Sequence, residues 1–455
     1  MVFSSLTFLC LFLPAFLLAY LAIPKLRTVT LVVFSLLFYA FGEPVWVLAL
    51  LFSSVVDYVN GLIIEKFPSP RVKKLALASS LIINLGMLAS FKYSGFVIEN
   101  INALFGLSIA APGFSLPLGI SFYTFQTLSY TIDVYRGEIK PQRSFLAFLS
   151  YVTMFPQLVA GPIVRYADIE QALTRRRVTL EGFSRGAARF AVGLGKKVLL
   201  ANPAGEAASV LFAGSRMTVL GSWLGIVFFA FQIYFDFSGY SDMAIGLGGM
   251  IGFDFKENFR YPYTADSVAD FWRRWHISLT TFFRDYVYIP LGGNRRRQAL
   301  NLVIVWLLTG LWHGASWNFI IWGGYYCVVL LAEKFLLKSI LSRVPGVLRR
   351  ACSLFMVLIG WAIFYFTDIS RLGGFFISAF GGARLYDFRV TSVFFTNIFL
   401  LAVLIIASTP LPSRLAARLR ARFPVAEPIG IALLMISCFT MLVGQTYNPF
   451  LYFRF

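Results

Sequence analysis

The chain has few charged residues, few cysteines and almost no histidine. Charged residues make up 13% of its 455 residues, against about 25% in a typical soluble domain. Apolar residues make up 58%, and the apolar runs leave no polar stretch long enough to fold separately. This composition excludes a string of soluble domains. It predicts one integral-membrane domain over residues 1–455, with helices at 1–110, a core at 115–340 and a C-terminal part at 350–455.

The scarcity of cysteine excludes two further kinds of site. Cys10, Cys327, Cys352 and Cys438 lie in apolar stretches, and no two of them have metal-ligand spacing. We therefore expect no disulfide framework and no metal site. The N-terminus has no basic region and no cleavage site before Lys25, which predicts a retained first helix.

Apolar runs predict the membrane segments, because a spanning helix needs roughly 20 largely apolar residues. Good candidates are 4–23, 45–64, 76–92, 116–135, 145–164, 217–237, 351–367, 392–408 and 429–446. Shorter or Gly-broken runs, at 28–41, 96–111, 183–200, 240–253 and 372–382, are expected to be tilted, interfacial or re-entrant. Such backbone is tolerated at membrane depth only inside protein or around a wet cavity. We expect an all-α polytopic protein with about eleven crossings around an internal chamber.

The net charge of +19 is compatible with a nucleic-acid partner or with basic cytoplasmic loops. Of the 40 basic residues, 17 fall in five loops, at 71–74, 175–177, 295–297, 338–350 and 414–422. Short cytoplasmic loops retain Lys and Arg, so we place these loops inside, both termini in the periplasm, and expect no nucleic acid. The amphipathic stretch 411–423 could lie on the inner membrane surface against lipids, or be a solvated loop.

Two carboxylates close one of the apolar helices. Asp236, Ser238 and Asp242 come at a membrane boundary, where ionisable residues are costly and take a functional or paired role. We expect them to line or support the internal chamber. Pairing of the carboxylates with Arg273 or Arg274 to fix the fold is equally open.

Arginines alternate with aromatic residues in the low-hydropathy segment that follows. Arg273, Arg274 and Arg284 lie there, and guanidinium groups suit phosphate and carboxylate groups. These arginines could hold an anionic ligand. They could equally be ordinary interface anchors, because aromatic belts with Arg are common at membrane surfaces.

One of the two histidines lies in an apolar segment. His313 is 16 residues after Arg297, about 24 Å if wholly helical, which is inside a hydrocarbon core of roughly 30 Å. A histidine there is costly unless it faces a polar cavity. Small neighbours such as Gly310 and Gly314 would let a chain or ligand approach closely. The alternative is a histidine that packs between helices and bonds to a carbonyl.

His313 as general base is the simplest catalytic hypothesis, because imidazole can exchange a proton with a hydroxyl or thiol near neutral pH. The sequence has no P-loop, metal-ligand cluster or catalytic cysteine pattern. His276 would be a second polar group, for orientation, proton passage or nucleotide contact. Trp312, Ser316 and Asn318 are expected to line or support the same site.

These residues resemble the membrane-bound O-acyltransferase (MBOAT) family. The resemblance is to its bacterial branch for alginate and peptidoglycan O-acetylation, with the D-alanyl transfer proteins more distant. It rests on Met1–Ser5, Pro117–Gln126, Ala160–Ile163, Asp236–Met243, Phe271–Leu279 and Trp312–Asn318. It implies a ring of tilted helices around a central tunnel, with His313 on the family's histidine and His276 on the preceding polar position.

The resemblance also implies the chemistry. It implies transfer of acetyl from cytoplasmic acetyl-CoA across the bacterial inner membrane, to O-acetylate an exported or cell-envelope polysaccharide such as alginate, cellulose or peptidoglycan. A periplasmic SGNH-type acetyltransferase would be the partner, and Arg273, Arg274 and Arg284 could hold the CoA phosphates.

The aromatic tail Asn448–Phe455 resembles the tail of this branch. Tyr452 carries its only hydroxyl, and we hypothesise that Tyr452 receives the acyl group as an ester, with His313 as base. The alternative is an interfacial aromatic anchor. Two other functions stay open: short-acyl or D-alanyl transfer from a carrier protein, and a transporter or flippase with His313 as proton relay.

Overall fold

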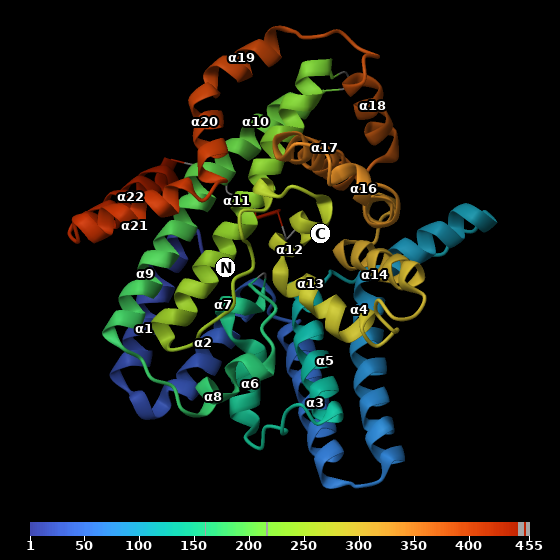
Figure 1. Cartoon of the computed structure of the whole chain (residues 1–455). Helices are drawn as coiled ribbons and strands as arrows, with labels where there is room; N and C mark the ends of the chain where they lie inside the picture. Colours follow the sequence, from blue (N-terminus) through green and yellow to red (C-terminus); the bar gives the residue numbers. More distant parts are fainter. Residues whose placement is uncertain (160, 215–216, 445–449, 452–455) are drawn as a thin grey trace. The chain divides into compact units, whose positions relative to one another are not determined.

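Helices account for the regular structure of the described chain, and strands are absent from it. The computed structural model describes residues 1–159, 161–214, 217–444 and 450–451. These residues divide into two compact units, Met1–Phe190 with Met243–Lys256, and Ala191–Asp242 with Glu257–Phe455. The prediction of an all-α protein is confirmed (Figure 1). The single-domain division stays a prediction.

The first unit contains the N-terminal helices. They are η1 (Phe8–Phe12), α1 (Leu13–Ala22), η2 (Pro24–Leu26), α2 (Arg27–Gly42), α3 (Val47–Lys66), α4 (Pro70–Phe105), α5 (Ile120–Arg136), α6 (Phe145–Thr153), α7 (Phe155–Leu158), α8 (Tyr166–Thr174) and most of α9 (Leu180–Gly195). Helices α3, α4 and α5 pack on one another, as Figure 1 shows. Nearly every residue of α5 is buried, so this helix forms the middle of the unit.

A polar junction joins α3, α4 and α5. Asp57 of α3 is fully buried and accepts hydrogen bonds from Ser80 and from Asn84 (2.8 Å), both on α4, and from Thr131 (3.0 Å) on α5. Buried polar groups need such partners. The entry to α5 depends on Gly119, whose φ is +73° and where a Cβ would lie 2.8 Å from the carbonyl oxygen of Leu158.

The second unit contains the remaining helices. They are η3 (Lys196–Ala201), α10 (Asn202–Phe212), α11 (Val219–Ile251, whose last turns belong to the first unit), η4 (Pro262–Thr264), α12 (Val268–Arg274), α13 (Ile277–Phe283), η5 (Arg284–Tyr288), α14 (Gln298–His313), α15 (Trp317–Leu331), η6 (Ala332–Leu336), α16 (Lys338–Leu341), α17 (Gly346–Tyr365), α18 (Ile369–Ala379), α19 (Phe388–Thr396), α20 (Ile398–Ala407), α21 (Leu411–Arg422) and α22 (Ala426–Gly444). Its core is rich in buried Phe, Trp and Tyr side chains.

Seven helices of the described residues are long and apolar enough to cross a membrane. They are Pro24–Gly42, Val47–Lys66, Pro70–Phe105, Val219–Ile251, Trp317–Leu336, Gly346–Tyr365 and Ala426–Gly444. The pair α19 and α20, bent by 58°, would make an eighth. The protein is therefore a multi-pass membrane protein, with fewer such helices than the eleven or so crossings that we expected.

The difference has three physical causes. Two runs read as separate pieces are the last turns of long helices: residues 96–105 belong to α4, which is capped by Gly106, and residues 240–251 belong to α11. The segment 145–164 is divided into α6 and the single-turn α7, which has Pro156 in its first turn. Three apolar helices, Phe8–Ala22, Gln298–His313 and Ile369–Ala379, are short. Conversely, the spanning helix Trp317–Leu336 is not among the segments predicted from the sequence.

Candidate active site

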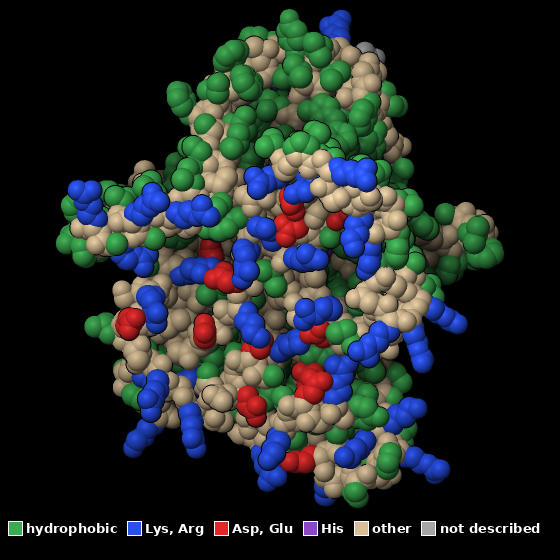
Figure 2. Space-filling model, viewed as in Figure 1, with side chains coloured by type: hydrophobic (Ala, Val, Ile, Leu, Met, Phe, Trp, Pro, Cys, Tyr) green, Lys and Arg blue, Asp and Glu red, His purple; other side chains and the backbone are tan. Residues whose placement is uncertain are grey.

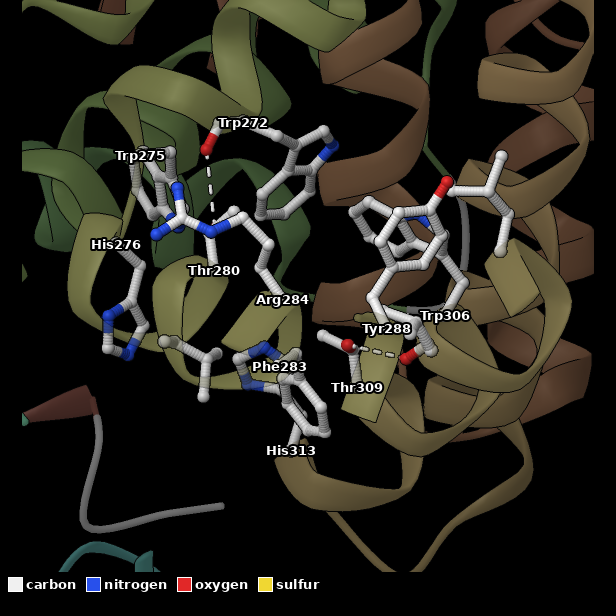
Figure 3. A pocket seen from close by; sticks show the side chains of 13 residues that line it. Trp272, Trp275, His276, Thr280, Phe283, Arg284, Tyr288, Trp306, Thr309 and His313 are labelled. Atoms are coloured by element: carbon white, nitrogen blue, oxygen red, sulfur yellow. Dashed lines mark hydrogen bonds between the residues drawn. The ribbon is translucent and has the colours of Figure 1, made fainter. Parts of the chain in front are cut away.

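Both histidines line one cavity in the second unit. The cavity has a volume of about 160 Å³. Its walls come from α12, α13, η5 and α14, and the lining residues are Trp272, Trp275, His276, Leu279, Thr280, Phe283, Arg284, Tyr288, Leu302, Val305, Trp306, Thr309 and His313 (Figure 3). A mostly apolar cavity with a few converging polar groups is the usual form of a small-molecule site.

His313 is the last residue of α14. The helix starts directly after Arg297 and is continuous to His313, which is the helical stretch predicted from the sequence. The imidazole is 7% exposed and packs edge-on against Trp322 (ring centroids 4.9 Å apart) and Phe364 (5.2 Å). These rings form two sides of the His313 environment, and the cavity lies on another.

Asn318 supports this enclosure and does not line the cavity. Its side-chain amide donates to the carbonyl oxygens of Ile363 and Phe364, both at 3.2 Å. It thereby ties the start of α15 to the end of α17, the segment that carries the Phe364 ring. Ser316, the residue before α15, has no side-chain capping bond to that helix.

Small residues let α14 and α15 approach closely, as predicted for Gly310 and Gly314. A Cβ on Gly310 would lie 3.3 Å from the Cα of Gly323, and a Cβ on Gly323 would collide with the carbonyl oxygen of Trp306. A Cβ on Gly314 would collide with the Phe319 ring. The close approach places Trp322 against His313.

His276 precedes α13 in an unusual backbone conformation. Its φ is +46°, a left-handed value that costs a non-glycine residue about 1–3 kcal/mol and is found mainly at functional sites. The side chain is 1% exposed. Trp312 lies between the two histidines, with ring centroids 5.8 Å from His276 and 4.9 Å from His313.

Asn258 determines which nitrogen of His276 carries the proton. The backbone N–H of Ser278 donates to Asn258 Oδ1 (3.1 Å), so that atom is the acceptor of the amide. The same oxygen lies 3.3 Å from His276 Nδ1, and the Ser278 hydroxyl, which donates to Asn258 Oδ1, lies 3.4 Å from that nitrogen; these contacts favour Nδ1 as the N–H. The Nε2 atom is left as an acceptor.

Burial keeps His276 neutral. The residue lies between α12 and α13, outside the spanning helices. Desolvation lowers the pKa of His276 to about 3 from an ordinary value of 6.5, because removal from water disfavours the charged imidazolium. The ring is therefore neutral across the physiological pH range.

A second and larger cavity, of about 530 Å³, adjoins the first. Leu302 lines both cavities, so they are neighbours. Basic side chains dominate the polar lining of the second cavity, which consists of Asp266, Ser267, Ala269, Arg273, Leu302, Leu330, Glu333, Lys334, Lys338, Leu341, Ser342 and Arg349.

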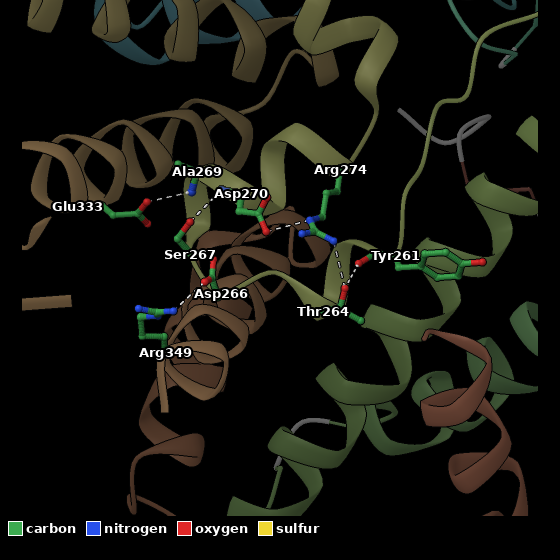
Figure 4. Close-up of polar contacts among 9 residues, drawn as sticks. All are labelled: Tyr261, Thr264, Asp266, Ser267, Ala269, Asp270, Arg274, Glu333 and Arg349. Carbon is green, nitrogen blue, oxygen red and sulfur yellow. Dashed lines mark hydrogen bonds and ion pairs between the residues drawn. The ribbon is translucent and has the colours of Figure 1, made fainter. Parts of the chain in front are cut away.

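The acidic residues of this second cavity are already engaged (Figure 4). Glu333 accepts from the backbone N–H groups of Val268 (2.8 Å) and Ala269 (3.2 Å), and Asp266 pairs with Arg349 (3.1 Å). Four basic side chains, Arg273, Lys334, Lys338 and Arg349, against two acidic ones leave the cavity lining with a net positive charge that suits an anionic ligand.

The comparisons with known proteins decide the family. The sequence model of the membrane-bound O-acyltransferase family matches residues 138–372, a range that includes both histidines. The chain belongs to the MBOAT family. It is 36% identical, over 500 aligned positions and the full length of both chains, to the probable alginate O-acetylase AlgI of Azotobacter vinelandii.

Two other relatives show how far the similarity extends. The peptidoglycan O-acetyltransferase of Helicobacter pylori is 35% identical over 73% of this chain and 70% of its own length. The teichoic acid D-alanyltransferase of Bacillus subtilis is 29% identical over 55% of this chain and 70% of its own length. This MBOAT protein is therefore an O-acyltransferase, and the transporter alternative is set aside.

The three predicted arginines are not together in the MBOAT structure. Arg284 lines the smaller cavity and pairs with Asp285 (2.6 Å), while Arg273 lines the larger one. Arg274 pairs with Asp270 (2.9 Å) and lies 3.4 Å from the Thr264 hydroxyl. Of these three arginines, Arg273 is the one that lines the larger, basic cavity.

The two carboxylates of α11 have lysine partners, and the pairing with Arg273 or Arg274 that we weighed is not observed. Asp236 pairs with Lys197 (2.7 Å), and Asp242 with Lys196 (2.6 Å). The π-helical η3 carries both lysines. Asp236 also accepts from the backbone N–H of Leu451 (2.8 Å), so the carboxylate anchors the chain near its C-terminus. Ser238 is buried in the same helix.

Sequence reasoning missed several residues that shape the site. Asn258, Phe364 and Lys197 carried no recognisable signal, because each acts through a partner far away in the sequence. Tyr452 lies outside the described residues. The described residues contain no cluster of three His, Cys, Asp or Glu side chains that could hold a metal.

Proposed function

We propose that this membrane O-acyltransferase transfers acetyl groups from cytoplasmic acetyl-CoA toward an exported or cell-envelope polysaccharide, in the bacterial inner membrane with both termini periplasmic. The observation that carries the proposal is the shared cavity of His276 and His313. The acetyl group and the acceptor class are taken from the similarity to alginate and peptidoglycan O-acetylating proteins. Alginate-like polymers, cellulose and peptidoglycan are the candidate acceptors.

The donor would bind across the two neighbouring cavities. Its phosphate groups would meet Arg273, Lys334 and Lys338 in the larger cavity, since ammonium and guanidinium groups suit phosphate. Its thioester would reach past Leu302, which lines both cavities, toward His313. The bulky charged nucleotide would stay at the basic cavity while the small acyl end enters the apolar one.

His313 would act as general base. Its imidazole takes the proton of the attacking hydroxyl, whose oxygen forms the new ester bond to the thioester carbonyl carbon. The carbon–sulfur bond then breaks, and the imidazolium returns the proton to the leaving thiolate. The apolar walls of Trp322 and Phe364 around His313 would keep water from competing for the acyl group.

His276 would orient the reactants and not exchange protons. With Nδ1–H donated to Asn258, the Nε2 atom would act as a hydrogen-bond acceptor. A hydroxyl or an amide N–H can donate to such an atom. The oxyanion that develops on the thioester carbonyl has no proton to donate, so Nε2 would not stabilise it. A different group must stabilise that negative charge.

The attacking hydroxyl would be that of Tyr452. The ester on Tyr452 would then pass its acetyl to the serine of a periplasmic SGNH-type partner, which delivers it to the polymer. The bond from Leu451 to Asp236 supports this order, because it anchors the residue directly before Tyr452. A partner is expected because the described residues contain no extramembrane domain large enough to bind a long glycan.

The second candidate is D-alanyl or other short-acyl transfer from a carrier protein. The similarity to a teichoic acid D-alanyltransferase favours it, but that similarity is lower and covers less of the chain than the similarity to the O-acetylating proteins.

The test is a donor comparison with purified protein in lipid vesicles. Acetyl-CoA labelled in the acetyl group should release CoA thiol and give label covalently attached to the protein, and a Tyr452→Phe variant should retain no label. Release of thiol from an acyl carrier protein, with none from acetyl-CoA, would overturn the proposed donor. Undiminished labelling of Tyr452→Phe would overturn the proposed intermediate.

A further inference from the structure

Helix α21 is held at a membrane boundary by the helices on either side of it. Three residues separate it from α20, and three separate it from α22. α22 is apolar and long enough to cross a membrane, and α20 belongs to the bent apolar pair. Because α22 can cross a membrane and α20 is apolar throughout, connections this short keep α21 close to the membrane surface.

Helix α21 carries a leucine stripe with arginines beside it. Leu411, Leu415 and Leu419 recur every fourth residue, so they line one side of the helix. Their exposed fractions are 58%, 54% and 46%. Arg414, Arg418 and Arg422 run along one edge of this stripe, with Arg422 in line with the leucines at the C-terminal end, and Arg420 lies on the far side. Figure 2 shows this basic row along the helix at the left of the view.

Polar contacts fix α21 in place while leaving its leucines uncovered. Near its start, Ser413 accepts a hydrogen bond from the Tyr261 hydroxyl (2.8 Å). Near its end, Arg420 pairs with Glu427 of α22 (2.9 Å). Every residue of α21 is exposed. Among the residues that the structure describes, the leucine side of α21 is therefore held in a fixed position and remains about half exposed.

We propose that α21 is a binding site for anionic phospholipid, lying flat in the headgroup region of the inner leaflet. The leucines would enter the acyl-chain boundary, and the arginines would contact lipid phosphates. A helix with low mean hydropathy, an apolar stripe and an Arg-rich face is the form that interfacial helices take. The charge fits as well, because the four arginines have only one carboxylate partner among the contacts of α21, Glu427.

This role is independent of acyl transfer. It concerns the position of the C-terminal helices in the bilayer, and a catalytically inactive protein would keep it. Two other states of α21, a solvated loop and a surface covered by a protein partner, are outcomes that the following experiment distinguishes.

Spin labels on opposite faces of α21 test the proposal. In the full-length protein, the exposed Cys10 and Cys352 are replaced by Ser, while the buried Cys327 and Cys438 are kept. One label is placed at Leu415→Cys, and the matched label at Ala417→Cys, about 200° around the helix. Each protein is reconstituted in phosphatidylcholine vesicles with and without 30% phosphatidylglycerol, roughly the range in which anionic surface charge acts.

The expected result is opposite accessibility of the two labels in power-saturation measurements. The label at position 415 should be relaxed by oxygen, which concentrates in the bilayer, and shielded from a water-soluble nickel chelate. The label at 417 should show the reverse. Phosphatidylglycerol should increase the depth of the label at 415, and Gln in place of all four arginines of α21 should abolish that increase.

Three results would overturn the proposal. Nickel access at both positions would show a solvated loop, and shielding from both reagents at 415 would show a protein cover. A depth at 415 that does not change with phosphatidylglycerol, or that still increases in the four-glutamine variant, would exclude a specific role for anionic lipid.

Discussion

The side-chain oxygen of Asn258 lies 3.3 Å from Nδ1 of His276, and the backbone N–H of Ser278 donates to the same oxygen. This arrangement fixes the His276 tautomer from outside the cavity. Asn258 is thus a positioning residue, since it does not line the cavity itself.

Asn258→Leu should lower acyl transfer by about 100-fold, the loss that a misplacement of roughly 1 Å near the reacting groups can cause. Nitrogen NMR of the imidazoles provides the readout that distinguishes positioning from folding, because the chain has only two histidines. The His276 signals should shift away from the Nδ1–H tautomer while those of His313 stay. Asn258→Asp keeps an acceptor oxygen and should keep the tautomer. An unchanged His276 spectrum in Asn258→Leu would show that Asn258 does not position the ring.

Acid should destabilise the protein partly through His276. The folded-state pKa of about 3 lies below the ordinary value of 6.5, so between these two pH values the unfolded chain binds the proton and the folded chain does not. Stability contributed by the neutral ring is present above pH 6.5 and falls as pH decreases toward 3. Thermal unfolding of His276→Gln in detergent should therefore lose less midpoint temperature between pH 7 and pH 4 than the wild type. Parallel losses would contradict burial of a neutral His276.

Gly323 and Gly324 form a matched pair on α15. A methyl group on Gly323 would meet the Trp306 carbonyl oxygen, whereas one on Gly324 would meet nothing within 4 Å. Gly323→Ala should cost about 1–3 kcal/mol of stability, the usual cost of overpacking, and should reduce transfer by moving Trp322 away from His313. Gly324→Ala should be neutral or slightly stabilising. Equal thermal stability and activity of the two variants would show that α14 and α15 are not in close contact here.

Lys334 and Lys338 should affect donor binding more than turnover. Both line the larger cavity, so replacing both with Gln should raise the KM for acetyl-CoA about 30-fold, since two charged contacts of roughly 1 kcal/mol each add up to about 2 kcal/mol, with little change in kcat. The control is Arg343→Gln with Arg350→Gln, which removes two charges from the same basic region but outside the cavity lining. A similar KM increase in the control would show that the effect comes from general surface charge and not from contacts in the cavity.

The sequence predicted the all-α membrane architecture, and it predicted a candidate site whose two histidines the structure places in one cavity. His313 could be identified because its distance from Arg297 placed it at membrane depth, and the structure confirms a continuous helix between them. The pairing of His313 with His276 came from motif resemblance, and the cavity now supplies its physical basis.

The remaining features depend on contacts that periodicity does not encode. Glycines in α11 were read as breaks, although Gly246 packs its backbone against Gly186 and the helix continues. Asp236 was recognisable as costly, but its partner Lys197 could not be found, because a π-helical turn decides where that lysine points. Asn258 lies in a polar loop with no pattern at all.

The central claim is that His313 is the general base in the shared cavity. The most direct measurement compares transfer from labelled acetyl-CoA by the wild type and by His313→Ala in the same vesicles, with and without added imidazole. The account predicts a loss of at least about 100-fold, with part of the activity restored by imidazole, which can occupy the vacated part of the cavity. Transfer by His313→Ala at close to the wild-type rate would contradict it.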